Sequence, residues 1–202
     1  MTWEKYRGKA QGWSDSAYTD AGTYLARRAE LVCTLGPELR PGDTVLDLAC
    51  GDGGLSDFLP EQRYVGVDAN TEMIAAGRAC GREIVEADLN AYVPPAPVEA
   101  TTIFRAIYYA ADRRALLERI AGYTTRKLVF DLNPRQYRLV DVRADLEAAG
   151  FDRLVTHPFF VPQTRASIPG LQLLERSGPV ARAILRLRFT LICSAWSGRT
   201  GT

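Results

Sequence analysis

Clustered metal ligands are missing from this chain of 202 residues. It contains one histidine, His157, and four cysteines that lie far apart and form no CxxC pair. The sequence therefore offers little material for a zinc site, and we expect no bound metal. A chain of this length can bury a sizeable core without disulfides, so reduced thiols are the default expectation.

The sequence also has no excess of positive or negative charge and no long apolar segment. The 25 basic and 24 acidic side chains leave a net charge of +1, which gives no general field for attracting nucleic acid or an anionic membrane. No stretch approaches ~20 apolar residues, and the first residues lack the apolar run of a signal peptide. We expect a soluble, cytoplasmic protein without stable membrane insertion. The oligomeric state stays open, a homodimer included.

Strand-like and helix-like patterns alternate along the middle of the chain. Strands are expected at 44–49, 63–68, 83–88, from 101 onward and at 127–132. Helices are expected at 24–39, 71–79, 112–121 and 139–150, with a brief one ending at Leu59. This alternation predicts an α/β fold whose mostly parallel sheet is covered by helices on both faces. After Phe151, two strands without a helix suited to a parallel crossover, 153–161 and 186–196, predict an antiparallel edge.

A glycine-rich turn directly follows the first expected strand, in the stretch Val45–Gly54 (VLDLACGDGG). Glycines let the backbone approach a ligand closely, and the next helix points its unpaired N–H groups at that ligand; a tight structural turn is the alternative. Asp47, inside the strand, can meet the ammonium of an amino-acid ligand but would repel a pyrophosphate. Ser56 stands where the dinucleotide fingerprint Gly51-x-Gly53-x-x-Gly/Ala has glycine or alanine. Both details favour an amino-acid nucleoside over NAD.

Two further acidic residues end the next two strands. Asp68 lies 17 residues after Gly51 and can accept hydrogen bonds from both ribose hydroxyls, a device that dinucleotide enzymes share. Asp88 can accept the exocyclic N–H of adenine, although an exposed strand-end aspartate is an equal alternative. Met73 can place its thioether against adenine, with ordinary helix packing as the alternative.

Three motifs at this order and spacing, VLDLACGDGG, YVGVDANTEMI and EADL, resemble the first three motifs of class I S-adenosylmethionine-dependent methyltransferases. The resemblance spans about residues 42–150 and, weakly, the closing strand pair. It implies a Rossmann-like three-layer sandwich with a mostly parallel seven-stranded sheet and an antiparallel edge strand. It also implies S-adenosylmethionine as the cofactor.

The resemblance assigns the cofactor contacts position by position. The loop around the methionine portion would be formed by Asp47, Ala49, Gly51 and Gly53. Asp68 would bind the ribose, and Asp88 and Leu89 would flank adenine. The expected cofactor site is completed by Cys50, Ala69, Met73 and Arg105. The sequence departs from the family at Ala49, where the family usually has its first glycine.

For catalysis, the resemblance implies methyl transfer by in-line displacement. The cofactor supplies the activated carbon and the protein aligns the reactants, so no obligatory catalytic signature is expected. The catalytic candidates are His157, as the obvious general base, Tyr108 and Asn133. A structural histidine, a packed tyrosine and a turn capped by Asp131 and Asn133 are the alternatives.

The substrate-binding candidates are Tyr18, Tyr109 and Arg135. Tyr109 could wall an aromatic pocket, and Arg135 could orient the substrate at the end of the fifth strand. Arg105 could instead hold an anionic group of the substrate, with a salt bridge to a neighbouring acid as an even alternative.

One domain covering residues 1–202 is expected. Residues 1–38 would form an N-terminal lid, including Trp13 and Tyr18, and a helix; a flexible tail is the alternative. Residues 42–150 would form the cofactor-binding core. Residues 151–202 would hold the terminal strand pair with a cap inserted at 162–185. The basic, amphipathic stretch 171–189 favours this cap, with contact at a membrane surface as the alternative.

The sequence thus predicts a methyltransferase that acts on O, N or C of a small-molecule substrate. A non-methylating S-adenosylmethionine-binding protein, such as a cyclase or regulatory subunit on the same fold, is the alternative. Asp47 and Ser56 disfavour an NAD-dependent oxidoreductase. Near-neutral charge disfavours a nucleic-acid partner, as does the sequence Arg-Ala-Ile-Tyr at 105–108, where nucleobase methyltransferases often carry Asn/Asp-Pro-Pro-Tyr/Phe.

Overall fold

A seven-stranded sheet with the strand order β3-β2-β1-β4-β5-β7-β6 organises the structure. The computed structural model describes residues 20–159 and 190–198. The strands are β1 (Thr44–Leu48), β2 (Arg63–Asp68), β3 (Ile84–Glu86), β4 (Val98–Ile103), β5 (Thr124–Leu132), β6 (Arg153–Pro158) and β7 (Leu191–Trp196). The helices are α2 (Ala21–Thr34), η2 (Gly54–Phe58), α3 (Thr71–Ala79), η3 (Ile107–Tyr109), α4 (Arg113–Ala121) and α5 (Leu139–Ala149).

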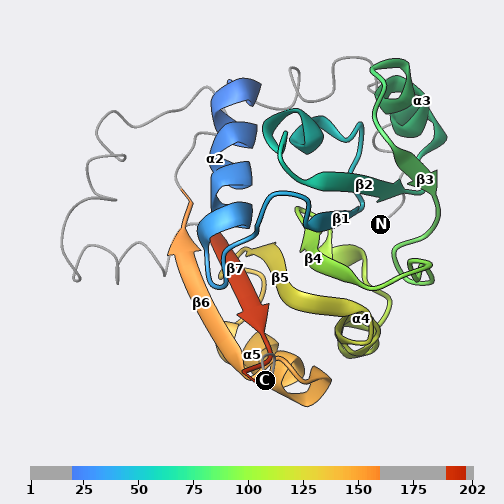
Figure 1. Cartoon of the computed structure of the whole chain (residues 1–202). Coiled ribbons are helices and arrows are strands. Elements are labelled where there is room, and N and C mark those ends of the chain that lie inside the picture. Colours follow the sequence, from blue (N-terminus) through green and yellow to red (C-terminus); the bar gives the residue numbers. More distant parts are fainter. Residues whose placement is uncertain (1–19, 160–189, 199–202) are drawn as a thin grey trace.

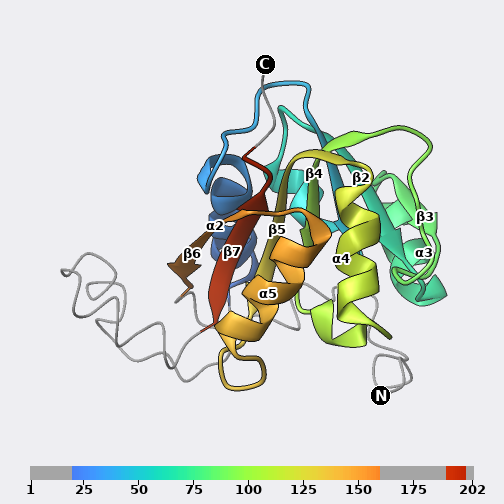
Figure 2. The same cartoon turned by 90° about the horizontal axis from the view of Figure 1, so that it is seen from below.

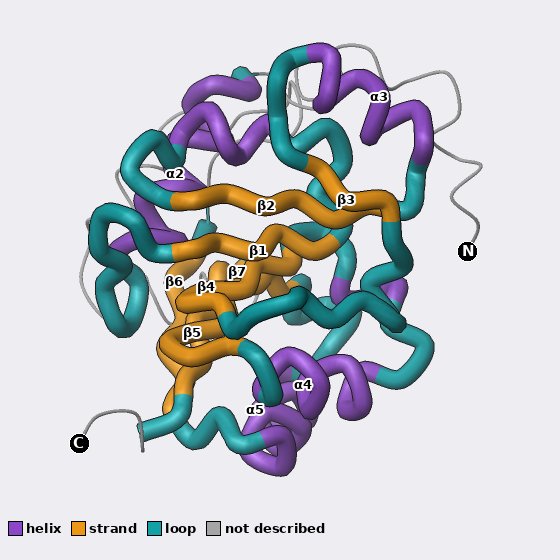
Figure 3. Tube along the Cα trace, turned by 45° about the vertical axis from the view of Figure 1, so that its right-hand side comes forward, coloured by secondary structure: helices purple, strands orange, loops and turns teal. Residues whose placement is uncertain are grey.

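Strands β1 to β5 are parallel to their neighbours, and β7 runs antiparallel to both β5 and β6. The antiparallel strand therefore lies one position in from the edge. Figure 3 shows strands β3, β2, β1, β4 and β5 stacked in this order. The mostly parallel α/β sheet that the alternating pattern predicts is confirmed. The order reverses between β1 and β4, which is where ligands bind in open sheets of this kind.

Helices cover both faces of the sheet. Helix α2 lies on one side, and α4 and α5 lie on the other (Figures 1 and 2). Side chains alternate along β1 accordingly: Val45 belongs to the apolar cluster with α2, whereas Leu46 and Leu48 belong to the cluster with α4 and α5. Asp47 shares the α2 side with Val45, because successive side chains of a strand point to opposite faces.

The first helix ends earlier than its apolar pattern predicts. The expected end is residue 39, but α2 ends at Thr34, and Gly36 has the left-handed φ of +76°. The buried ammonium of Lys127 donates hydrogen bonds to the carbonyl oxygens of Cys33 and Leu35, each at 3.1 Å. A cation at the negative end of the helix dipole stabilises this termination.

Strands β4 and β5 both begin three residues before their expected starts, at Val98 and Thr124. Polar residues such as Glu99 interrupt the apolar pattern there, yet the backbones of Val98 and Thr124 are already paired in register. The expected lid (1–19) and cap insertion (162–185) lie outside the described residues, so both stay predictions. Within the described part of the chain, the helices are too short or too polar to cross a membrane.

Candidate cofactor and substrate site

A cavity of about 440 Å³ opens at the carboxyl ends of β1, β2, β3 and β4. Its wall comes from the ends of these strands, from the turns and helices that follow them, and from two residues of α2, Leu25 and Arg28. A volume of this size is ordinary for a small-molecule site. The strand ends that carry the three sequence motifs therefore converge on one space.

The turn after β1 contributes Ala49, Cys50 and Gly51 to the cavity wall, and their cofactor contacts stay predictions. Left-handed φ angles recur along this turn: +57° at Ala49, +63° at Gly51 and +72° at Gly53. Gly53 does not line the cavity; it is the N-cap residue of the 3₁₀ helix η2. The φ angle at Ala49 gives the physical reason for the glycine usual at this position, because an L-residue is strained there.

Asp47 is a buried carboxylate held by two hydroxyls at the base of this wall. Tyr64 donates a hydrogen bond to Oδ2 at 2.8 Å, and Thr102, its register partner on β4, donates one to Oδ1 at 2.6 Å. Burial raises the pKa of Asp47 to about 6, against the two hydroxyls and the Arg28 guanidinium, which lower it. At neutral pH the group is an anion with little solvent around it, and it is suited to a cationic ligand group.

Asp68 ends β2 and holds the glycine turn from the other side. Its Oδ2 accepts the N–H of Gly51 at 2.7 Å, and its Oδ1 accepts the N–H of Asn70 at 2.8 Å. Burial raises its pKa, and the backbone N–H groups of Asn70, Gly51 and Ala69 lower it. Each carboxylate oxygen has lone pairs left for a further donor. The group can therefore accept two hydroxyls while it fixes the turn.

The part of the wall beyond Asp68 combines two apolar side chains, Met73 and Leu89, with the carboxylate of Asp88. Met73 on α3 and Leu89 after β3 are both buried and both line the cavity. Asp88 lies beside Leu89, and its Oδ1 accepts the backbone N–H of Asn90 at 2.8 Å and the side-chain amide of Asn90 at 2.9 Å. Apolar side chains next to a carboxylate suit a flat heterocycle with an exocyclic amine.

The end of β4 carries Arg105, Tyr108 and Tyr109, and all three line the cavity; their cofactor, catalytic and substrate roles stay predictions. Arg105 has φ of +54°, and its backbone N–H donates to Oδ1 of Asp131 at 2.6 Å. The two tyrosine rings lie 4.5 Å apart between centroids. Asp131, which the sequence offered as a turn cap, thus fixes a strained loop of the cavity from β5.

Sequence reasoning missed Arg28. This residue lies on α2 with 4% of its surface exposed, yet it belongs to the cavity wall. Its Nη2 lies 3.3 Å from Oδ2 of Asp131. A signal was available, because Arg28 stands on the apolar stripe of its helix at helical spacing from Tyr24 and Val32.

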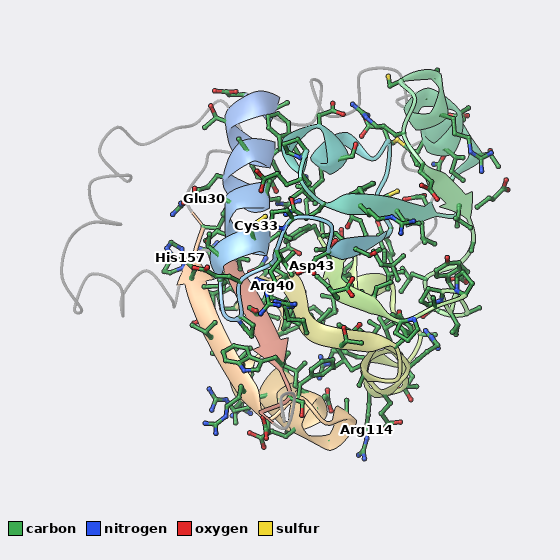
Figure 4. All side chains as sticks on the ribbon, viewed as in Figure 1. Glu30, Cys33, Arg40, Asp43, Arg114 and His157 are labelled. Atoms are coloured by element: carbon green, nitrogen blue, oxygen red, sulfur yellow. The ribbon has the colours of Figure 1, made fainter. Side chains whose placement is uncertain are left out.

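Three of the predicted residues, Asn133, Arg135 and His157, are not among the residues that line this cavity. Asn133 accepts the backbone N–H of Arg135 at 3.0 Å, the turn-capping role named as its alternative, and neither residue lines the wall. His157 lies on β6, at the sheet edge far from β3 (Figure 4), and its Nδ1 lies 2.8 Å from the carbonyl oxygen of Pro158. Tyr18 lies outside the described residues. The catalytic or substrate roles of these four residues stay predictions.

Comparison with known proteins identifies similar sequences and similar folds. No family profile matches the chain. Trans-aconitate 2-methyltransferase of Azoarcus sp. (strain BH72) is 31% identical over 132 residues, which cover 62% of this chain and 52% of that protein. The chain therefore spans about half the length of this curated relative.

Solved structures match over nearly the whole chain. A chain of a Haloferax volcanii complex that contains the Trm112 methyltransferase activator has a TM-score of 0.69 and 18% identity, covering 98% of both chains. The TehB-like SAM-dependent methyltransferase of Corynebacterium glutamicum has a TM-score of 0.67 and 15% identity, covering 97% of this chain and 100% of the other. At such identities the likeness is one of fold.

Proposed function

We propose that this chain is a class I S-adenosylmethionine-dependent methyltransferase that transfers a methyl group from S-adenosylmethionine to a small-molecule acceptor; the similarity to the trans-aconitate methyltransferase and the likeness of fold support this proposal. One observation carries the proposal: the three motifs converge on a single cavity whose polar groups match the parts of this cofactor. When bound, S-adenosylmethionine supplies an electrophilic methyl carbon on a sulfonium.

The donor and acceptor set of the wall fits an amino-acid nucleoside. Asp47 offers a buried anion to an ammonium, and Asp68 offers lone pairs to two ribose hydroxyls. Met73 and Leu89 offer apolar faces to adenine, and Asp88 accepts from its exocyclic amine. The glycine turn lets the ligand approach the backbone between Asp47 and Asp68. A nicotinamide dinucleotide would bring its pyrophosphate against the carboxylate of Asp47.

The acceptor side of the same cavity is lined by Phe104, Arg105, Tyr108 and Tyr109. These side chains suit a small acceptor with apolar surface, and they would align its nucleophilic atom and exclude water. Tyr108 is the catalytic candidate that lines the cavity, and its hydroxyl could position the acceptor. The identity of the relative favours the small-molecule class, since that protein is named as a trans-aconitate methyltransferase.

Isothermal titration calorimetry tests the proposal, with S-adenosylmethionine, S-adenosylhomocysteine and NAD as ligands. We expect the two sulfur nucleosides to bind and NAD not to bind. Asp68→Ala should lower affinity for both nucleosides by at least about 100-fold, because the ribose contacts are lost and the turn at Gly51 is released. The exposed carboxylate of α5 supplies the control Asp141→Asn, which should bind as the wild type does.

Two results would contradict the proposal. Absence of binding by folded wild-type protein would exclude the cofactor. Binding without transfer of label from methyl-labelled cofactor to any acceptor in a small-molecule extract would favour the non-methylating alternative.

A further inference from the structure

Arg28 carries a positive charge into the interior of the molecule. Charged side chains are seldom this buried unless they are paired. Its guanidinium carbon lies 4.4 Å from the ring centroids of both Tyr24 and Phe104 and 5.9 Å from that of Phe159. Aromatic faces stabilise a cation electrostatically and restrict its orientation. The three rings therefore hold the guanidinium in place at the cavity wall.

The hydrogen bonding of this guanidinium is incomplete. Its Nη2 contacts Oδ2 of Asp131 at 3.3 Å, longer than the ~2.7–2.9 Å usual between charged partners. Its Nε is buried and has no hydrogen-bond partner among the described residues. Asp131 is shared, since its other oxygen accepts the N–H of Arg105 at 2.6 Å. A guanidinium has five N–H donors, so donor capacity remains beside the cavity.

Arg28 and Asp47 belong to the wall of one cavity and act on each other electrostatically. The guanidinium lowers the pKa of Asp47 against the effect of burial. Both side chains lie on the α2 side of the sheet, Asp47 from β1 and Arg28 from α2 itself. A buried anion and a buried cation on the same wall are the complement of a zwitterion, which carries one ammonium and one carboxylate on a single carbon.

We propose that Arg28 binds the carboxylate of the amino-acid end of the cofactor, with Asp47 opposite the ammonium and Asp131 as the positioning residue of Arg28. The inference rests on the proposed function and deepens it, because none of the three sequence motifs contains Arg28. Arginine suits this role since its planar fork can offer two N–H groups to one carboxylate.

Calorimetry tests the proposal by comparing the affinities of two protein forms for two ligands. The ligands are S-adenosylhomocysteine and its decarboxylated analogue, and the protein forms are wild type and Arg28→Lys. Wild type should bind the analogue at least about tenfold more weakly than S-adenosylhomocysteine, because a charged hydrogen-bonded pair is lost. In Arg28→Lys this preference should shrink to less than about threefold, since a lysine ammonium keeps the charge but offers no planar fork.

Arg27→Lys is the matched control, because Arg27 neighbours Arg28 on α2 and is not part of the cavity wall. It should keep the wild-type preference for the carboxylate. Circular dichroism checks that Arg28→Lys is folded. If this variant is unfolded, the double variant Arg28→Met/Asp131→Asn takes its place in the cycle, because it removes both buried charges together. Asp131→Asn alone should reduce the preference less than the Arg28 variants, as a positioning role requires.

The outcomes separate this inference from the proposed function. If wild type binds neither ligand, the proposed function fails and the inference fails with it. If wild type binds both equally, or if Arg28→Lys keeps the full preference for the carboxylate, the inference alone is overturned. Equal weakening of both ligands in Arg28→Lys would also overturn it, because the arginine would then only support the shape of the cavity.

Discussion

Replacing Asp47 by asparagine should make the protein more stable at neutral pH and weaken its affinity for the cofactor. In the folded protein burial raises the pKa of Asp47 from 3.8 to about 6. An asparagine can keep partners for Tyr64 and Thr102, because its amide both donates and accepts. The substitution therefore removes the cost of a buried charge without leaving either hydroxyl alone.

The magnitude and the pH window follow from the two pKa values. At about 1.4 kcal/mol per tenfold change in acidity, ionised Asp47 costs about 3 kcal/mol of folding stability at pH 7. Because the folded-state pKa is the higher one, the stability that Asp47 contributes is fully present below pH 3.8 and is lost as the pH rises through about 6. Asp47→Asn has no such loss. Its advantage should be near zero at pH 4 and should reach its full value above pH 6.

Urea unfolding of both proteins between pH 4 and pH 8 measures this difference, and calorimetry with S-adenosylhomocysteine measures the affinity. Affinity should fall by at least about tenfold in Asp47→Asn, since the ammonium loses its counter-charge. The control is Asp141→Asn, which changes an exposed carboxylate on α5. It should change the free energy of unfolding by less than about 1 kcal/mol, and this difference should not rise between pH 4 and pH 6. The reasoning would be refuted if Asp47→Asn were less stable than the wild type at neutral pH, or if the difference in their free energies of unfolding did not change with pH.

The other predictions concern Ala49 in the glycine turn and Gly77, the α3 glycine that packs against this turn. Ala49→Gly should raise the free energy of unfolding by about 0.5–1 kcal/mol, because glycine relieves the left-handed φ but gains freedom in the unfolded chain; an unchanged or lower urea midpoint would contradict this. Gly77→Ala should cost at least about 2 kcal/mol and weaken cofactor binding, because a Cβ would lie 2.3 Å from Cδ1 of Ile84 and 2.5 Å from the carbonyl oxygen of Asp52. Gly22→Ala, whose Cβ meets nothing closer than 3.7 Å, is the control and should be neutral or stabilising.

The part of the site that could be predicted from the sequence is the part built from strand ends. Asp47, Gly51, Asp68 and Asp88 stand at or just after strands that local patterns reveal. The carboxyl ends of parallel strands meet at one edge of the sheet, so these residues had to converge once the strands were recognised. The sheet itself was predictable for the same reason, because strand and helix periods alternate clearly over 44–150.

Contacts between distant segments could not be predicted in this way. The pair of Arg28 and Asp131 joins residues 103 positions apart, and no local pattern states how α2 lies against the end of β5. His157 shows how far residue type alone can lead: the imidazole suggested a base, and the strand order, with β7 between β5 and β6, puts His157 on the outer strand of the sheet. Position in the sheet, rather than residue type, decides which side chains reach the cavity.

The departures from local structural rules gather at the cavity. Within residues 20–159 and 190–198, the non-glycine residues with positive φ are Ala49 and Arg105, and both line it. Buried charges of both signs, Asp47 and Arg28, line it as well. Strained backbone and desolvated charge persist only where surrounding structure holds them, and they concentrate at functional sites. A ligand with an ammonium and a carboxylate would compensate both charges at once. These strained and desolvated features thus favour the same ligand as the motifs do, and the buried charge of Arg28 does so from outside the motifs.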